Sequence, residues 1–184
     1  MPWAPGQAAG LGLYPQQGRA VHRSRRVAAP VHLVPFDPGL AAHFARLNRE
    51  WIERFFVLEP ADLAVLNDPH AAVIARGGMI YFALLGDEVV GTCAVMPHEP
   101  GTLELAKMAV SPSAQGRGVG RLLGEACIAF ARTTDAHTLM LHSSSKLGPA
   151  LHLYETLGFR HAPMPPGVEY ARADVHMELA LSGA

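Results

Sequence analysis

Apolar residues alternate with polar ones in several short stretches of this chain, and they recur every third or fourth residue in the segments between them. The first pattern is typical of β-strands and the second of amphipathic helices. Strands are predicted at residues 31–36, 79–85, 89–96, 103–110, 137–143 and 174–181. Helices are predicted at about 40–55, 58–66 and 120–133, and from Pro149, a favoured first-turn residue, to a stop at Gly158.

The order of these elements indicates the fold class. One strand and two helices are followed by three strands joined by short turns, which favours an antiparallel meander. The helix between the strands at 103–110 and 137–143 makes a crossover, so those two strands should run parallel. The chain is therefore predicted to form an α/β fold around a mixed sheet.

Composition and charge indicate how the chain is divided into a leader and a domain. The chain has 184 residues, 49% of them hydrophobic, which suits one globular domain. Residues 1–30 contain four arginines and no acid, and they are rich in Pro, Gly, Ala and Gln. We expect a disordered basic leader there, either a transit peptide or an over-extended start, before a domain at 31–184.

Several function classes receive no support. The net charge of −1 gives no case for nucleic acid, and no apolar run approaches the ~20 residues that span a bilayer. Cys93 and Cys127 are expected to be small buried residues in a reducing cytoplasm. The ten histidines are scattered, the nearest to a cluster being His137, His142, His152 and His161, and no metal-site spacing occurs.

The stretch Q-G-R-G-V-G, residues 115–120, opens the crossover helix. Glycines there would let backbone N–H groups turn toward an anion at the positive end of the helix, with Arg117 and Arg121 at the rim. The stretch lacks the Gly-Lys-Ser/Thr ending of a Walker loop and the G-x-G-x-x-G dinucleotide pattern, which disfavours a nucleotide-binding regulator. A tight connecting turn is the structural alternative.

Together with a second motif, this loop resembles the coenzyme A loop of the GCN5-related N-acetyltransferase (GNAT) superfamily. The second motif is Leu-Tyr-x-x-x-Gly-Phe, here Leu153 to Phe159, and the resemblance extends from Val31 to about Leu181. It implies the acyl-CoA acyltransferase fold, with a mixed sheet of about seven strands flanked by helices that splays between the strands around the crossover helix. It also implies acetyl-CoA as co-substrate, held by Met108, Ala109, Val110, Gln115, Gly116, Arg117, Gly118, Val119, Gly120, Arg121 and Ser144.

The resemblance further assigns catalytic roles. Tyr154 would be the general acid for the departing thiolate, although its position also suits a core aromatic. Glu104 would be the base for the amine, although it could equally be a solvated glutamate at the sheet edge. Strand alternation, if no bulge intervenes, puts Glu104, Ala106, Met108 and Val110 on one side and Lys107, a structural or rim charge, on the other.

The implied activity is direct acetyl transfer, in a ternary complex, to a primary amine of an unidentified small molecule or peptide. The alternative is a non-catalytic acyl-CoA binding or sensing module on the same fold. Residues 48–62 and 163–170 are expected to wall the acceptor site, where Glu50, Glu53, Glu59 and Asp62 lie among aromatics; these acids could instead be solvated. No nucleic acid, membrane or metal partner is expected, and a homodimer is possible.

Overall fold

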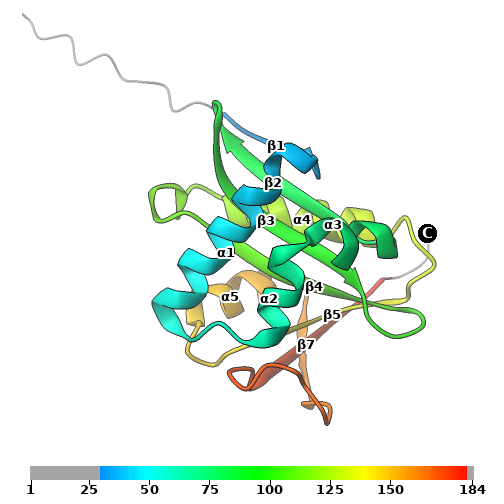
Figure 1. The fold of residues 1–184 in the computed structure, drawn as a ribbon. Helices are drawn as coiled ribbons and strands as arrows, with labels where there is room; N and C mark the ends of the chain where they lie inside the picture. Colours follow the sequence, from blue (N-terminus) through cyan, green and yellow to red (C-terminus); the bar gives the residue numbers. More distant parts are fainter. Residues whose placement is uncertain (1–29, 182–184) are drawn as a thin grey trace, which may run out of the picture.

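The computed structural model describes residues 30–181 (Figure 1). The predicted leader at residues 1–30 therefore lies almost entirely outside the described residues. The strands are β1 (Val31–Pro35), β2 (Met79–Leu85), β3 (Glu88–Pro97), β4 (Thr102–Val110), β5 (Thr138–Ser143), β6 (Arg160–Ala162) and β7 (Val175–Ala180). The helices are α1 (Ala41–Phe55), α2 (Pro60–Asn67), α3 (Pro69–Ala72), α4 (Val119–Ala131) and α5 (Gly148–Thr156), with 3₁₀ turns η1 (Pro38–Leu40), η2 (Ile74–Arg76) and η3 (Pro112–Ala114).

The strands form one mixed sheet in the order β1-β2-β3-β4-β5-β7-β6. The β4–β5 pair is parallel and the other neighbours are antiparallel, so the predicted fold class and the predicted crossover are confirmed. Strand β6 was not predicted from the sequence, because three residues are too few to show an alternating pattern.

Helices cover both faces of the sheet (Figure 1). Phe44 and Leu47 of α1 pack with Phe82 and Ala94 of the sheet on one face. On the other face, Leu123 of α4 packs into a core with buried residues of the central strands. Within residues 30–181, no helix combines the length and apolarity needed to cross a membrane.

A bulge interrupts β4 at Lys107. Ala106 pairs with Ala94 and Ala109 pairs with Thr92, so Lys107 and Met108 together face Cys93. Lys107 has φ +54°, a left-handed conformation that costs a non-glycine residue about 1–3 kcal/mol. The extra residue reverses the alternation of side chains beyond it.

The reversal corrects one sequence prediction. Leu105 belongs to the core beneath α4, so Glu104 and Ala106 face α1, whereas Met108 and Val110 lie against the α4 core. Ala109 belongs to the core beneath α1. The four residues predicted to share one side of the strand are therefore divided between the two faces.

The parallel pair β4–β5 opens beyond its first three residues. Pairing runs from Thr102 with Thr138 to Glu104 with Met140 and then stops. The splay implied by the resemblance is thus present. From Leu105 onward, β4 presents an edge toward β5 that is not paired with it, in the middle of the sheet.

Candidate active site

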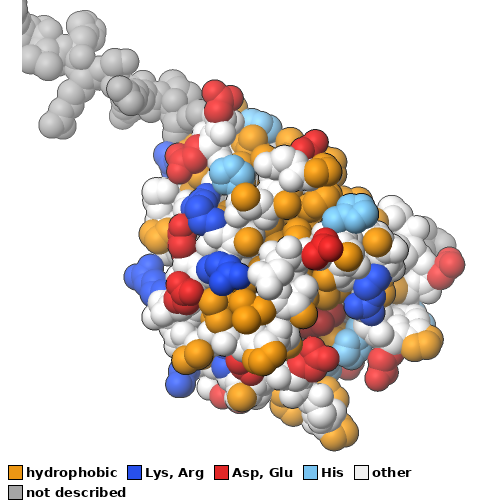
Figure 2. Space-filling model, viewed as in Figure 1, with side chains coloured by type: hydrophobic (Ala, Val, Ile, Leu, Met, Phe, Trp, Pro, Cys, Tyr) orange, Lys and Arg blue, Asp and Glu red, His pale blue; other side chains and the backbone are white. Residues whose placement is uncertain are grey.

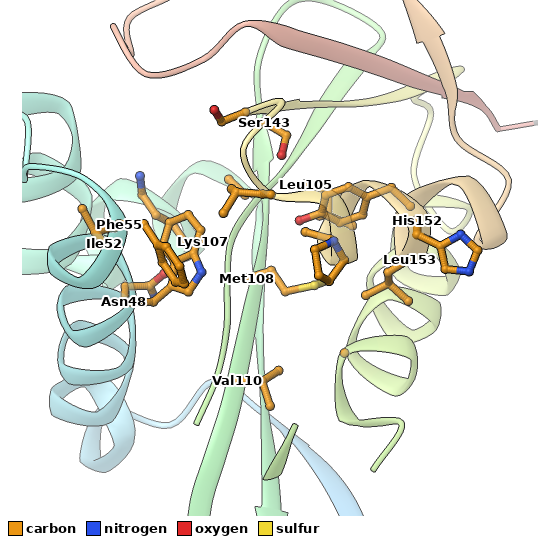
Figure 3. A pocket seen from close by; sticks show the side chains of 18 of the residues that line it. Asn48, Ile52, Phe55, Leu105, Lys107, Met108, Val110, Ser143, His152 and Leu153 are labelled. Atoms are coloured by element: carbon orange, nitrogen blue, oxygen red, sulfur yellow. The ribbon is translucent and has the colours of Figure 1, made fainter. Parts of the chain in front are cut away.

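A cavity of about 770 Å³ occupies the opening between β4 and β5. In Figure 3, Asn48, Ile52 and Phe55 of α1 lie on one side of it and His152 and Leu153 of α5 on the other. Lys107, Met108 and Val110 of β4 lie between these two walls. Residues 114–116 and 118–121 line the end of the cavity beside α4.

The three glycines before α4 are there for two different reasons. Gly116 and Gly118 have φ +73° and +78°, and a Cβ on either would point into open space. Gly120 lies inside the first turn of α4, and a Cβ there would come within 3.0 Å of Leu153 Cδ2. The first two glycines therefore set the turn of the loop, and Gly120 allows α4 and α5 to approach each other.

The N–H groups of residues 116–121 have no acceptor within the part of the chain that the structure describes. The first internal bond of α4 is from Leu122 N–H to the carbonyl of Gly118, 3.0 Å, and no side chain caps this helix. Free amides at a helix N-terminus favour an anion there.

Most residues predicted to bind the coenzyme line the cavity, but two do not. The lining includes Met108, Val110, Gln115, Gly116, Gly118, Val119, Gly120, Arg121 and Ser144. Ala109 is buried in the core beneath α1, and Arg117 is exposed outside the lining. Arg121 is tied to α5 by a bond from its Nη2 to Thr156 Oγ1, 2.9 Å.

Tyr154 reaches the cavity from α5 with its ring in the core. The residue is 9% exposed and its ring meets Phe159 edge-on, with 6.1 Å between centroids. Burial raises the pKa of Tyr154 well above its usual range. Its hydroxyl bonds to none of the described residues, so it is free to donate a hydrogen bond to a group bound in the cavity.

Glu104 lies on the α1 side of the opening, with its side chain 16% exposed. Its Oε1 is 3.9 Å from Nδ1 of His142 on β5. That distance is too long for a direct hydrogen bond, but it leaves room for a shared partner. Glu104 is thus a partly buried carboxylate that lines the cavity.

An ion cluster closes the wall beside α1. Asp62 is fully buried and accepts hydrogen bonds from Lys107 Nζ (2.8 Å) and from both terminal nitrogens of Arg172 (2.7 and 2.8 Å). Arg172 also bonds Glu59 (2.8 Å), and Lys107 bonds the hydroxyl of Tyr170 (2.8 Å). Burial would raise the pKa of Asp62, but these bonds hold it at about 2.

The cluster gives Lys107 a structural role. With its side chain 5% exposed, Lys107 is a buried structural charge rather than a rim charge. Two cations balance the two carboxylates of Glu59 and Asp62, so the cluster is formally neutral. It ties the start of α2 to the segment before β7, and the contact of Lys107 with Asp62 offsets the strain of the bulge.

In the segment 48–62 that was predicted to wall the acceptor site, the aromatic side chains line the cavity and the four acids do not. Trp51, Phe55 and Phe56 line the cavity, and Figure 2 shows hydrophobic side chains at the surface near the end of α1. None of the four acids lines it. Glu50 pairs with Arg46 on the exposed face of α1, Glu53 is exposed, and Glu59 and Asp62 are taken by the cluster.

The sequence analysis assigned no individual role to three residues of the cavity, His142, Tyr170 and Arg172, although Tyr170 ends the segment 163–170 that was expected to wall the acceptor site. Tyr170 and Arg172 belong to a segment between strands whose path no periodicity fixes. His142 was read as one of the scattered histidines, yet its cross-strand neighbour is His176. Alternation within each strand was visible, but the register between β5 and β7 was not.

Comparison with known proteins identifies the family. Residues 44–159 match the model of the Acetyltransferase (GNAT) family. N-acetylaspartate synthetase of Rattus norvegicus is 35% identical over 86 residues, which cover 46% of this chain and 29% of that protein. The chain therefore matches less than a third of the length of that relative.

Solved structures share the fold. An acetyltransferase of the GNAT family from Staphylococcus aureus superposes with a TM-score of 0.76 at 15% identity, covering 83% of this chain and all of that one. The protein yncA of Salmonella typhimurium, solved with its cofactor acetyl-CoA, superposes with a TM-score of 0.69 at 19% identity, covering 85% of this chain and 96% of that one. At these identities the likeness shows the fold alone.

Proposed function

The chain belongs to the Acetyltransferase (GNAT) family, and on that premise we propose that it transfers an acetyl group from acetyl-CoA to a primary amine. The transfer is direct, within a ternary complex of both substrates. The observation that carries the proposal is the row of free amides at residues 116–121, which opens onto the same cavity as Tyr154 and Glu104.

The residues present fit the coenzyme. The free amides of the loop and the open space around Gly116 and Gly118 suit the diphosphate. The unpaired edge of β4 from Met108 to Val110 suits the amide-containing pantetheine arm, which can bond to it as an added strand would. Ala109 would take part only through its backbone. Bound acetyl-CoA supplies an activated thioester.

Glu104 and Tyr154 meet the two proton requirements of the reaction. An alkylammonium ion must lose a proton before its nitrogen can attack, and Glu104 accepts that proton. As the new C–N bond forms and the C–S bond breaks, Tyr154 donates from its hydroxyl to the leaving sulfur. Its raised pKa keeps the hydroxyl protonated until the sulfur departs.

The acceptor subsite suits an amine attached to an apolar group. Trp51, Phe55 and Phe56 provide the apolar surface, and Phe55 remains 51% exposed at the mouth. Glu104 is the lining carboxylate able to receive the ammonium group, because Asp62 is already paired. Aromatic and long-chain primary amines, free or on a peptide, should therefore be better acceptors than small polar amines.

Coenzyme A release measured against a panel of such amines tests the proposal. Tyr154→Phe should lower kcat by about 10²-fold or more while acetyl-CoA affinity stays unchanged, because general acid catalysis is lost and binding is not. Tyr81→Phe, on β2 outside the cavity lining, is the matched control. If acetyl-CoA binds but no amine releases coenzyme A, the alternative of a non-catalytic acyl-CoA sensor is the better description.

A further inference from the structure

Two buried histidines of the sheet, one of them 3.9 Å from Glu104, each have a ring nitrogen with no partner in the part of the chain that the structure describes. His142 on β5 and His176 on β7 are direct cross-strand neighbours, with ring centroids 5.0 Å apart. Their side chains are 8% and 7% exposed. Among residues 30–181, His142 Nε2 and His176 Nδ1 find no hydrogen-bond partner and are both buried, although buried polar groups are nearly always bonded.

These rings belong to a polar line across one face of the sheet. Leu139, Leu141 and Met177 point into the core beneath α4, so His142, His176 and Glu178 share the opposite face with Glu104. Glu104 is 3.9 Å from His142 Nδ1. At the far end, His176 Nε2 and Glu178 Oε1 are 3.0 Å apart, and the Glu178 side chain is 51% exposed.

We propose that Glu104, His142, His176 and Glu178 form a proton-exit path from the acceptor amine to solvent. The inference rests on the proposed function, in which Glu104 is the base. In this path, His142 Nε2 donates the proton and His176 Nδ1 receives it. A carboxylate that stays protonated after one turnover cannot serve the next, and a partly buried one needs a route by which to lose its proton.

The transfers balance as follows. The ammonium ion gives its proton to Glu104, which passes it through a bridging water to His142 Nδ1. His142 releases the proton on its Nε2 to His176 Nδ1 when a rotation of the facing rings, whose centroids are 5.0 Å apart, brings these two nitrogens together. His176 then releases its Nε2 proton to Glu178, and Glu178 passes it to bulk water. Each ring gains one proton and loses one, and it resets by exchanging tautomers.

Three other polar groups that line the cavity, Lys107, Tyr170 and Arg172, are already bonded and do not compete for this role. Lys107 and Arg172 are bonded to Asp62, and the Tyr170 hydroxyl accepts from Lys107. Arg160 of β6 is the cross-strand neighbour of Glu178 at the outer edge. The path therefore ends between a carboxylate and a cation at the surface.

Kinetics of acetyl transfer provide the first test. His142→Ala should lower kcat about a hundredfold or more, within the range of general acid–base effects, and imidazole should restore it. Pyrazole, which has the same size but is a much weaker base, should not. His142→Gln guards against misfolding, and His161→Gln, exposed on β6, is the control. Equal rescue by pyrazole, or rates within twofold of wild type, would overturn the path.

Ring ¹⁵N spectra provide a second test that needs no turnover. Glu178→Gln should shift the ring resonances of both His176 and His142, because one tautomer chain links them, whereas His161→Gln should shift neither. A response confined to His176 would contradict the path. If both histidines respond to Glu178→Gln but no amine is acetylated, only the proposed function is contradicted. If an amine is acetylated but the two histidines do not respond together, only the proton-exit path is contradicted.

Discussion

Asp62→Asn is the substitution that tests the ion cluster most sharply. It replaces one carboxylate oxygen by an NH₂ group that cannot accept, and it leaves Lys107 and Arg172 buried with a neutral partner. Breaking one partner of a buried ion pair costs about 3–5 kcal/mol. For a chain of this size, each kcal/mol lowers the melting temperature by about 2–4 °C, so a loss of roughly 6–20 °C is expected.

The pKa of Asp62 gives a second, independent value for the free energy that the cluster contributes to stability. A shift from 3.8 to about 2 corresponds to about 2.5 kcal/mol of stability at neutral pH. Because the folded pKa is depressed, this contribution is complete above the ordinary value and is lost as pH falls through about 2. The stability difference between wild type and Asp62→Asn should therefore shrink by about 1 kcal/mol at pH 3 relative to pH 7.

Urea denaturation at pH 7, 5 and 3 measures both quantities. Asp87→Asn, in the exposed turn after β2, is the control and should change stability by less than about 0.5 kcal/mol. Adding Lys107→Met to Asp62→Asn should recover part of the loss by removing one uncompensated cation. A stability difference below about 1 kcal/mol, or one that does not vary with pH, would refute the reasoning.

Three further substitutions probe other features. Gly118→Glu should abolish acetyl-CoA binding in calorimetry, because it places bulk and negative charge before α4. The control Gly77→Glu, with φ +88° and equally open space, should leave binding intact. If Gly118→Glu still binds acetyl-CoA, the diphosphate does not bind at this loop. Gly124→Ala should destabilise by about 1–3 kcal/mol because its Cβ would collide with Leu157 Cδ1, and an unchanged melting temperature would show that Leu157 yields freely. Lys107→Gly should be more stable than Lys107→Ala by about 1–2 kcal/mol in urea, since both lose the ion pair but only alanine keeps the strain of the bulge; equal stability would argue against that strain.

The strands, the main helices and the glycine loop could be predicted because each is indicated by a local pattern in the sequence. Alternation and helical spacing located six of the strands and the main helices, and the crossover set the direction of β5. The loop at 115–120 was found because glycine is costly before a helix unless the backbone requires it.

What the sequence did not show depends on residues brought together from far apart. Nothing near Lys107 indicates a left-handed residue within a strand, because its compensation comes from Asp62 and Tyr170, 45 and 63 positions away. The pairing of His142 with His176 depends on strand register, which local alternation leaves open. Nothing near Glu59 and Asp62 in the sequence indicates that Arg172, more than a hundred positions away, pairs with both carboxylates.

The central claim is that the backbone amides of residues 116–121 bind the diphosphate of the coenzyme. Amide ¹H–¹⁵N spectra recorded during a titration with coenzyme A test it directly, with pantetheine, which lacks the diphosphate, as the comparison. The account predicts that coenzyme A shifts the resonances of Gly116 to Arg121 strongly and that pantetheine leaves them in place. Unmoved resonances with saturating coenzyme A, or equal shifts with pantetheine, would contradict it.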